Sequence, residues 1–271
     1  MLHIVTVHFG SPRWVEIQAS YLREHIPVPF QTWTSLEGID PSYGAHFDHV
    51  FEQRGRHPGK LNHLALEISH QAPDDDLLMF LDGDAFPIAD PMPLIEDALG
   101  RAPLVAVRRA ENVGDPQPHP CFCVTSVGTW RRLPGDWSGG YTWPGHRGKL
   151  VTDVGANLLR ALELAELEWV QVLRSNRVNL DPLFFGIYGD VLYHHGAGFR
   201  PGELSRAYLD QAPGRLAGSG TPSLLRPLAR SVSMRRRAAW VKRTQKSYLQ
   251  RSEAIYAKIN AGGEEWLNDL R

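Results

Sequence analysis

The chain has 271 residues, of which 42% are hydrophobic and 22% are charged, and its formal net charge is -1. This composition is that of a globular protein, with enough apolar residues for one large domain or two small ones. No run approaches the roughly 18 consecutive apolar residues of a membrane span, and the first residues lack the basic region and cleavage site of a signal peptide. We therefore expect a cytoplasmic protein.

The basic charge is concentrated near the C-terminus. Residues 200–251 carry 12 Lys/Arg against 2 Asp/Glu, whereas residues 1–199 carry 15 against 24. Such a division suggests an acidic partner, which can be a lipid headgroup, a nucleic acid or another protein. No aromatic stacking platform or helix-turn-helix signal accompanies the charge, so nucleic acid is not expected. We expect this segment to contact either the surface of a membrane or a second copy of the chain.

In chain order, the first third of the sequence alternates between expected strands and helices. Strands are predicted at 3–10, 29–35, 48–53 and 76–86, and helices at 11–26 and 57–70. The continuous apolar run LLMFL is typical of a strand that is covered on both faces. Strands that alternate with helices imply a parallel α/β sheet.

The middle of the chain continues this pattern with a longer loop. We expect helices at 91–100 and 152–165, strands at 103–108, 121–130, 168–173 and 189–198, and a loop rich in glycine and aromatic residues at 134–149. Cys121 and Cys123 are one residue apart, where a mutual disulfide would be strained. They are expected to be reduced thiols in a strand.

The last fifty or so residues read as a basic amphipathic helix. Apolar residues recur on one stripe at spacings of three, four or seven, namely Met234, Ala238, Val241, Tyr248, Ile255 and Ile259, until Gly262 and Gly263 end the pattern. Packing of this stripe on the remainder of the chain or on a second subunit is one interpretation. Binding to an anionic membrane, with Trp240 at its surface, is the other.

Asp82 and Asp84 follow the apolar run with one glycine between them. In open α/β sheets ligands bind beyond the carboxyl ends of the strands, so both carboxylates are expected at a binding edge. Two carboxylates this close repel each other unless a divalent cation lies between them and a ligand, and oxygen ligands favour Mg²⁺ or Mn²⁺. Phosphate oxygens commonly complete a Mg²⁺ shell, so a diphosphate is expected too. A solvated Asp-Gly-Asp turn is the alternative.

The strand, its place about eighty residues into an alternating chain, and the following AFPIADP resemble the Asp-X-Asp motif of the GT-A fold glycosyltransferase superfamily. The resemblance covers roughly residues 1–201. It implies a Rossmann-like GT-A fold with a mostly parallel central sheet flanked by helices. It also implies the transfer of a sugar from a nucleotide-diphosphate sugar to an acceptor hydroxyl, with Mn²⁺ or Mg²⁺ bound by Asp82 and Asp84.

The resemblance implies a further metal ligand in VLYHHGAGFRP, residues 191–201. Many metal-dependent members supply a histidine from such a loop, followed by small residues and a basic one that touches the diphosphate. His195 is the first choice as ligand, His194 is the second, and Arg200 is the phosphate contact. Adjacent side chains of a strand face opposite ways, so only one of the two histidines is expected at the metal.

Other residues are candidates for the nucleotide. Lys60 can combine its charge with a helix N-terminus to hold phosphate, and Asn62 can add a hydrogen bond near the sugar. In related proteins the end of the first strand, here Val7, His8 and Gly10, cradles the nucleobase, largely through the backbone. The alternative for Lys60 is a solvated side chain.

The acceptor side offers a carboxylate and several aromatic rings. Asp153 lies at an expected helix start, where it is either the base that takes the acceptor's proton or an ordinary helix cap. Trp137, Tyr141 and Trp143 are either platforms for the apolar face of a sugar or acceptor, or lid and core residues. The sequence leaves the stereochemical course, the donor and the acceptor open.

These observations predict a catalytic domain at 1–201, with a nucleotide-sugar half at about 1–90 and an acceptor half at about 91–201, and a basic helical extension at 202–271. The alternative functions are a haloacid dehalogenase-like phosphatase, a nucleotidyltransferase, and a non-enzymatic protein that binds a membrane or partner through the basic segment.

Overall fold

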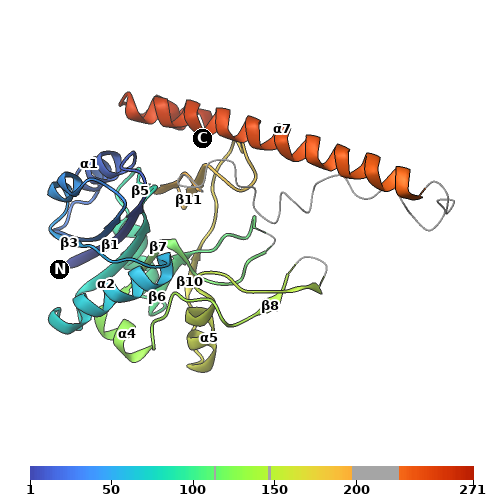
Figure 1. Ribbon diagram of the computed structural model, residues 1–271. Helices are drawn as coiled ribbons and strands as arrows, with labels where there is room; N and C mark the ends of the chain where they lie inside the picture. The colour runs from blue at the N-terminus through green and yellow to red at the C-terminus, as the bar shows by residue number, and fades with distance from the viewer. Residues whose placement is uncertain (113, 146–147, 197–225) are drawn as a thin grey trace. The chain divides into compact units, whose positions relative to one another are not determined.

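The computed structural model describes residues 1–112, 114–145, 148–196 and 226–271 (Figure 1). The described residues fall into two compact units. The first contains the chain up to residue 196 together with Leu267–Arg271, and the second contains the long C-terminal helix. Arg200, the predicted phosphate contact, lies outside the described residues.

The first unit is built on a seven-stranded sheet with the order β10-β6-β7-β4-β1-β2-β3. Its strands, in chain order, are β1 (Leu2–Phe9), β2 (Phe30–Glu37), β3 (His49–Phe51), β4 (Leu77–Asp82), β6 (Leu104–Val107), β7 (His119–Ser126) and β10 (Val170–Val172). All of its pairings are parallel except those of β7 with β4 and β6. The predicted α/β class with a mostly parallel central sheet is therefore confirmed.

Two small antiparallel sheets complete the strands. One has the order β11-β12-β5, from β11 (Gly186–Tyr188), β12 (Leu192–His194) and β5 (Ala85–Pro87). The other pairs β8 (Trp143–Pro144) with β9 (Leu150–Val151). Because β5 begins three residues after β4 ends and pairs with β12, the Asp-Gly-Asp turn connects the large sheet to the first small one.

Helices cover both faces of the large sheet (Figure 1). They are α1 (Val15–His25), α2 (His57–Gln71), α3 (Met92–Leu99), α4 (Val127–Arg132) and α5 (Ala156–Leu164). The chain also contains the short 3-10 helices η1 (Pro41–His46) and η4 (Glu265–Asp269). Alternate residues of β4 enter opposite cores, as the strand period of two requires. Leu78 and Phe80 pack with residues of α2 and α5, whereas Met79 and Leu81 pack with residues of α1 and α3.

Several predicted element boundaries were wrong, and two of them have clear local causes. The strand predicted at 121–130 ends at Ser126, whose hydroxyl accepts the Thr129 N–H and caps α4. The helix predicted at 152–165 begins only at Ala156. Gly155 precedes it with a φ of 85°, and a Cβ there would lie 2.2 Å from the Pro118 carbonyl oxygen, so the chain cannot be helical earlier.

The strand order identifies where a ligand would enter. β1 lies between β2, which follows it, and β4, which comes later in the chain, so the order reverses beside β1. Open α/β sheets bind ligands at the carboxyl ends of the strands next to such a reversal. Asp82 is the last residue of β4 and therefore lies at this position.

The second unit contains α7 (Arg226–Asn260), which confirms the predicted C-terminal helix. It ends just before Gly262 and Gly263, as expected. The last residues return to the first unit, because the Leu270 carbonyl accepts the N–H groups of Arg177 and Val178 at 3.0 and 3.1 Å. None of the described helices is both long enough and apolar enough to cross a membrane.

Candidate metal centre

Two carboxylates and one imidazole meet at the end of β4. The ligand atoms of Asp82, Asp84 and His194 all lie within 4.8 Å of one another. His194 Nε2 is 3.5 Å from Asp82 Oδ2 and 3.4 Å from Asp84 Oδ1. The antiparallel pairing of β12 with β5 places His194 opposite Ala85, the residue that follows the turn, and so brings the imidazole to the carboxylates.

Two more histidines face Asp82. His57, the first residue of α2, has its Nε2 3.3 Å from Asp82 Oδ1. His119, the first residue of β7, has its Nδ1 3.9 Å from Asp82 Oδ2. β7 runs antiparallel to β4, so its first residue lies at the same edge as the last residue of β4. The sequence analysis missed both histidines, although their places at a helix start and a strand start were available as signals.

The site has the donor set and the electrostatics of a cation site. Burial raises the pKa of Asp82, the neighbouring charge of Asp84 acts in the same direction, and His57 and His194 act in the opposite one. Oδ1 of Asp82 is buried and accepts no hydrogen bond from the described residues. Carboxylate oxygens with an imidazole nitrogen suit Mn²⁺ and other divalent cations that accept both donor types. The residues therefore fit the expected metal.

Glycine is required between the two aspartates for steric reasons. A Cβ on Gly83 would lie 2.5 Å from the Val7 carbonyl oxygen and 2.8 Å from His8 Nδ1. Real Cβ atoms do not approach backbone so closely. The turn thus passes directly against the end of β1.

A buried glutamine holds the turn from the α1 face. The Gln18 amide nitrogen donates to the carbonyl oxygens of Asp82 and Ala85 at 2.9 and 2.7 Å. Its oxygen accepts from Thr6 and His8. Burial lowers the pKa of His8 to about 4, so this ring is neutral at physiological pH. Nothing in the pattern of an amphipathic helix distinguishes Gln18 from a surface glutamine, so the sequence analysis missed it.

The structure corrects the choice between the two histidines of β12. His195, the first choice, faces away from the carboxylates into the core. Its ring packs 4.6 Å from that of Trp14 and its Nδ1 is hydrogen-bonded to the Tyr193 hydroxyl at 2.9 Å. Side chains alternate along β12 as expected, but His194 and not His195 is the one that faces the carboxylates.

Lys60 lies in the first turn of α2, as predicted, but its charge is already matched. The side chain is 2% exposed, and its ammonium group pairs with the Glu37 carboxylate at the end of β2. The pKa of Glu37 is lowered, chiefly by this hydrogen bond. Lys60 also lies 5.1 Å from the centre of the Phe9 ring. This placement does not support the predicted role of Lys60 as a free cation for phosphate.

Asn62 fixes a loop instead of facing the site. Its side-chain oxygen accepts the Trp137 N–H at 2.9 Å, and its nitrogen donates to Asp136 at 2.6 Å. Asp136 also accepts from Asn157 of α5. Trp137 is fully buried in the core, which agrees with the second of its two interpretations, that of a core residue. Tyr141 lies over Arg160 of α5, so its ring also has a local partner.

The predicted nucleobase residues lie where expected, at the end of β1. The side chains of Val7 and His8 are buried, so any contact with a base would use the backbone. Gly10 has a φ of 68° and donates its N–H to the Glu37 carbonyl at 2.8 Å. Nucleobase binding by these residues stays a prediction.

A partly buried arginine was also missed. Arg109 follows β6 and donates to the Leu183 carbonyl at 3.3 Å, and its NH1 lies 3.5 Å from His119 Nε2. Its charge lowers the pKa of Asp82. Its Nε is buried without a hydrogen-bond partner among the described residues. Arg109 therefore adds positive charge beside the carboxylates.

Asp153, the predicted base, is exposed and lies before α5. Its Oδ1 accepts the N–H of Val154 at 2.9 Å, a local contact typical of a turn. Close by, Asp115 is buried and accepts from Asn112 at 2.6 Å. Burial raises the pKa of Asp115 to about 6, and the charge of Asp153 acts in the same direction. Asp115 and Asp153 therefore lie close enough to interact electrostatically.

Replacing Asp115 by asparagine is expected to stabilise the protein at pH 7 but not at pH 4. A carboxyl group whose pKa is higher in the folded state binds a proton there first, so wild-type stability falls as pH rises from about 4 to about 6 and is flat above that. The difference in pKa corresponds to about 3 kcal/mol. Urea unfolding at pH 4, 5, 6 and 7 measures it, with Asp97→Asn on the exposed surface of α3 as the control. A difference between Asp115→Asn and wild type that does not change with pH would contradict the prediction.

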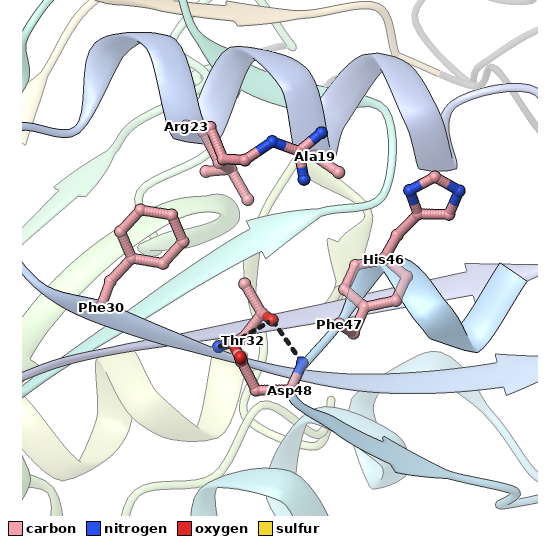
Figure 2. Close-up of a pocket in the computed structure, with 8 residues that line it drawn as sticks. Ala19, Arg23, Phe30, Thr32, His46, Phe47 and Asp48 are labelled. Atoms are coloured by element: carbon pink, nitrogen blue, oxygen red, sulfur yellow. Dashed lines mark hydrogen bonds between the residues drawn. The ribbon is translucent and has the colours of Figure 1, made fainter.

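One pocket lies away from this site. Figure 2 shows Arg23 and His46 across the pocket from Phe30 and from the hydrogen-bonded pair of Thr32 and Asp48. Its volume is about 270 Å³. It lies between α1, β2 and η1. No predicted site residue lines it, so it is separate from the candidate metal centre.

No family model matches the sequence, and no curated protein does. The solved structures that resemble the chain include glycosyltransferases. Galactosyltransferase LgtC in complex with donor and acceptor sugar analogs is 15% identical over 48% of this chain and 59% of its own, with a TM-score of 0.31. The chain thus spans less than two thirds of that protein.

Two other solved glycosyltransferase structures also resemble the chain. The apo glycosyltransferase GlyE of Streptococcus pneumoniae TIGR4 is 13% identical over 63% of this chain and 44% of its own, with a TM-score of 0.40. The mannosyltransferase PcManGT of Pyrobaculum calidifontis, in complex with GDP-Man and Mn²⁺, is 12% identical over 98% and 77%, with a TM-score of 0.44.

Proposed function

We propose that this protein is a metal-dependent glycosyltransferase that moves a sugar from a nucleotide-diphosphate sugar to an acceptor hydroxyl. The observation that carries the proposal is the cluster of Asp82, Asp84 and His194 beside the reversal of strand order. A cation site at this edge of an α/β sheet, next to a turn of the form Asp-X-Asp, supports diphosphate binding through a metal. The donor base, the sugar and the acceptor are not assigned.

The three clustered residues would hold Mn²⁺ or Mg²⁺, which supplies positive charge to a departing diphosphate. His57 and His119 flank the Asp82 carboxylate at 3.3 and 3.9 Å and would limit its movement when the cation binds. Arg109 is the cation that we assign to the phosphate oxygens in place of Lys60, because its guanidinium group lies 3.5 Å from His119, which is itself next to Asp82. Arg200 remains a proposed phosphate contact.

On the acceptor side, bond breaking at the sugar builds positive character on the anomeric carbon. Direct displacement then requires a carboxylate that accepts the proton of the attacking hydroxyl. Asp153 remains the proposed base, with Asp115 beside it as the buried partner. A retaining reaction would not require this step.

Thermal stabilisation by nucleotides tests the proposal. We would heat the protein with UDP, GDP, dTDP or CMP, each with and without Mn²⁺. A ligand that binds only the native state at about 100 times its dissociation constant adds roughly 2.7 kcal/mol. One nucleotide is expected to raise the melting temperature only with Mn²⁺, and the Asp84→Ala variant is expected to lose this effect.

If no nucleotide shifts the transition under either condition, the proposal is wrong. Phosphatase assays are then the next experiment, because a haloacid dehalogenase-like enzyme also places an aspartate after an apolar strand. Peripheral membrane contact and a homodimer contact through α7 stay predictions that rest on its basic charge. They are independent of the metal centre.

A further inference from the structure

Gln18 uses every hydrogen-bonding position of its side chain, although it is completely buried. The amide nitrogen donates to the carbonyl oxygens of Asp82 and Ala85, and the amide oxygen accepts from Thr6 Oγ1 and His8 Nε2, each at 3.0 Å. A primary amide has two donor hydrogens and two acceptor lone pairs. No capacity is left for water or for another ligand.

The orientation of this amide is determined by its partners. A flipped amide would turn its oxygen toward the two turn carbonyls, which cannot donate, and would leave two buried acceptors without a donor. His8 supports the same orientation, since the neutral ring can carry its proton on Nε2 and donate it to the amide oxygen. The network therefore has one arrangement.

The two carbonyls that Gln18 holds lie on either side of Gly83 and Asp84. Between them, the carbonyl of Asp84 accepts the N–H of His195 at 3.0 Å. The backbone of the turn is thus fixed by α1 on one side and by the segment that carries His194 on the other. Both carboxylates project from this fixed backbone.

We propose that Gln18 is a positioning residue for the cation site. It sets the backbone between Asp82 and Asp84 so that their oxygens converge before a cation arrives. Preorganised ligands bind more tightly because the ordering of the backbone is already complete in the free protein. The proposal rests on the proposed function only in requiring that the site takes a divalent cation.

A graded series of variants separates positioning from simple stabilisation. Gln18→Met keeps the size of the side chain and removes both donors. Gln18→Glu is expected to be protonated in this buried place and so restores one donor. Thr6→Val is the matched control, because it removes a hydrogen bond to the same amide without touching the turn.

The measurement is the dissociation constant of Mn²⁺, from the electron paramagnetic resonance signal of the free ion. Melting curves by circular dichroism are recorded on the same samples in parallel. Gln18→Met is expected to weaken Mn²⁺ binding about tenfold, Gln18→Glu by less, and Thr6→Val not at all, although both Gln18→Met and Thr6→Val lower the melting temperature.

Several outcomes are decisive. Equal Mn²⁺ affinity in folded Gln18→Met and wild type would overturn the proposal, as would an equal loss in Thr6→Val. If wild type binds Mn²⁺ but no nucleotide, the glycosyltransferase function fails and the role of Gln18 is judged by the series alone. If wild type binds no Mn²⁺, both are overturned.

Discussion

Asp82→Asn is expected to abolish tight Mn²⁺ binding and at the same time to stabilise the metal-free protein. Burial disfavours the charged form of Asp82, and the like charge of Asp84 adds repulsion, so the metal-free fold contains an unfavourable buried carboxylate. An amide of the same shape removes that repulsion. Binding sites are commonly strained in this way, and neutralising them raises stability at the expense of function.

The expected loss of Mn²⁺ affinity is at least about a hundredfold, or roughly 2.7 kcal/mol. The expected gain in metal-free stability is about 1 kcal/mol. Calorimetric titration with Mn²⁺ measures the first, and urea unfolding in the presence of a chelator measures the second. Asp97→Asn is the control, since it makes the same chemical change on the exposed surface of α3.

The opposite result would identify a structural aspartate. If Asp82 only accepts hydrogen bonds within the turn, the variant will be less stable without metal, and its response to Mn²⁺ will match that of wild type. A loss of both stability and metal binding would mean that the turn itself had been disrupted.

Gly83→Ala is expected to cost about 3 kcal/mol of unfolding free energy and to remove metal binding with it. The added methyl group would meet the Val7 carbonyl oxygen at 2.5 Å. β1 is paired on both sides, with β2 and β4, so its backbone cannot move without breaking sheet hydrogen bonds. The turn must move instead, and it carries Asp82 and Asp84.

Gly59→Ala is the matched control for this substitution. Gly59 lies within α2, and a Cβ there would have nothing within 4 Å. Alanine is the better helix former, so this variant is expected to gain about 0.5 to 1 kcal/mol. Guanidinium unfolding of the two variants measures both effects. If Gly83→Ala has the same unfolding free energy as wild type, the turn must have room for a methyl group, and the prediction is wrong.

The sequence was sufficient to predict the strands around the site and the edge of the sheet at which it lies. A period of two in strands and an apolar run that ends in Asp82 are local signals, and both led to the correct strands and edge. Local signals also predicted that one histidine of the pair at 194–195 would face the carboxylates. Which one does so depends on how β12 pairs with β5, a contact between segments far apart in the chain.

The residues that were missed, and those whose role was interpreted wrongly, depend on tertiary contacts in the same way. Gln18 and His57 acquire their roles only when their helices pack on the sheet. Lys60 was placed correctly on its helix, but its pairing with Glu37 joins two separate elements. Trp137 lies in a glycine-rich loop that suggests exposure, yet Asn62 holds that loop against the core.

The three-residue pairing of β12 with β5 also has a consequence for the order of folding. His194 reaches the carboxylates only after the chain closes a long loop, and such distant contacts form late because loop closure costs entropy before it gains contacts. The cation site would therefore be complete only when almost the whole first unit has folded. Binding of Mn²⁺ during refolding would report the final step of assembly, and an incompletely folded chain would not capture the ion.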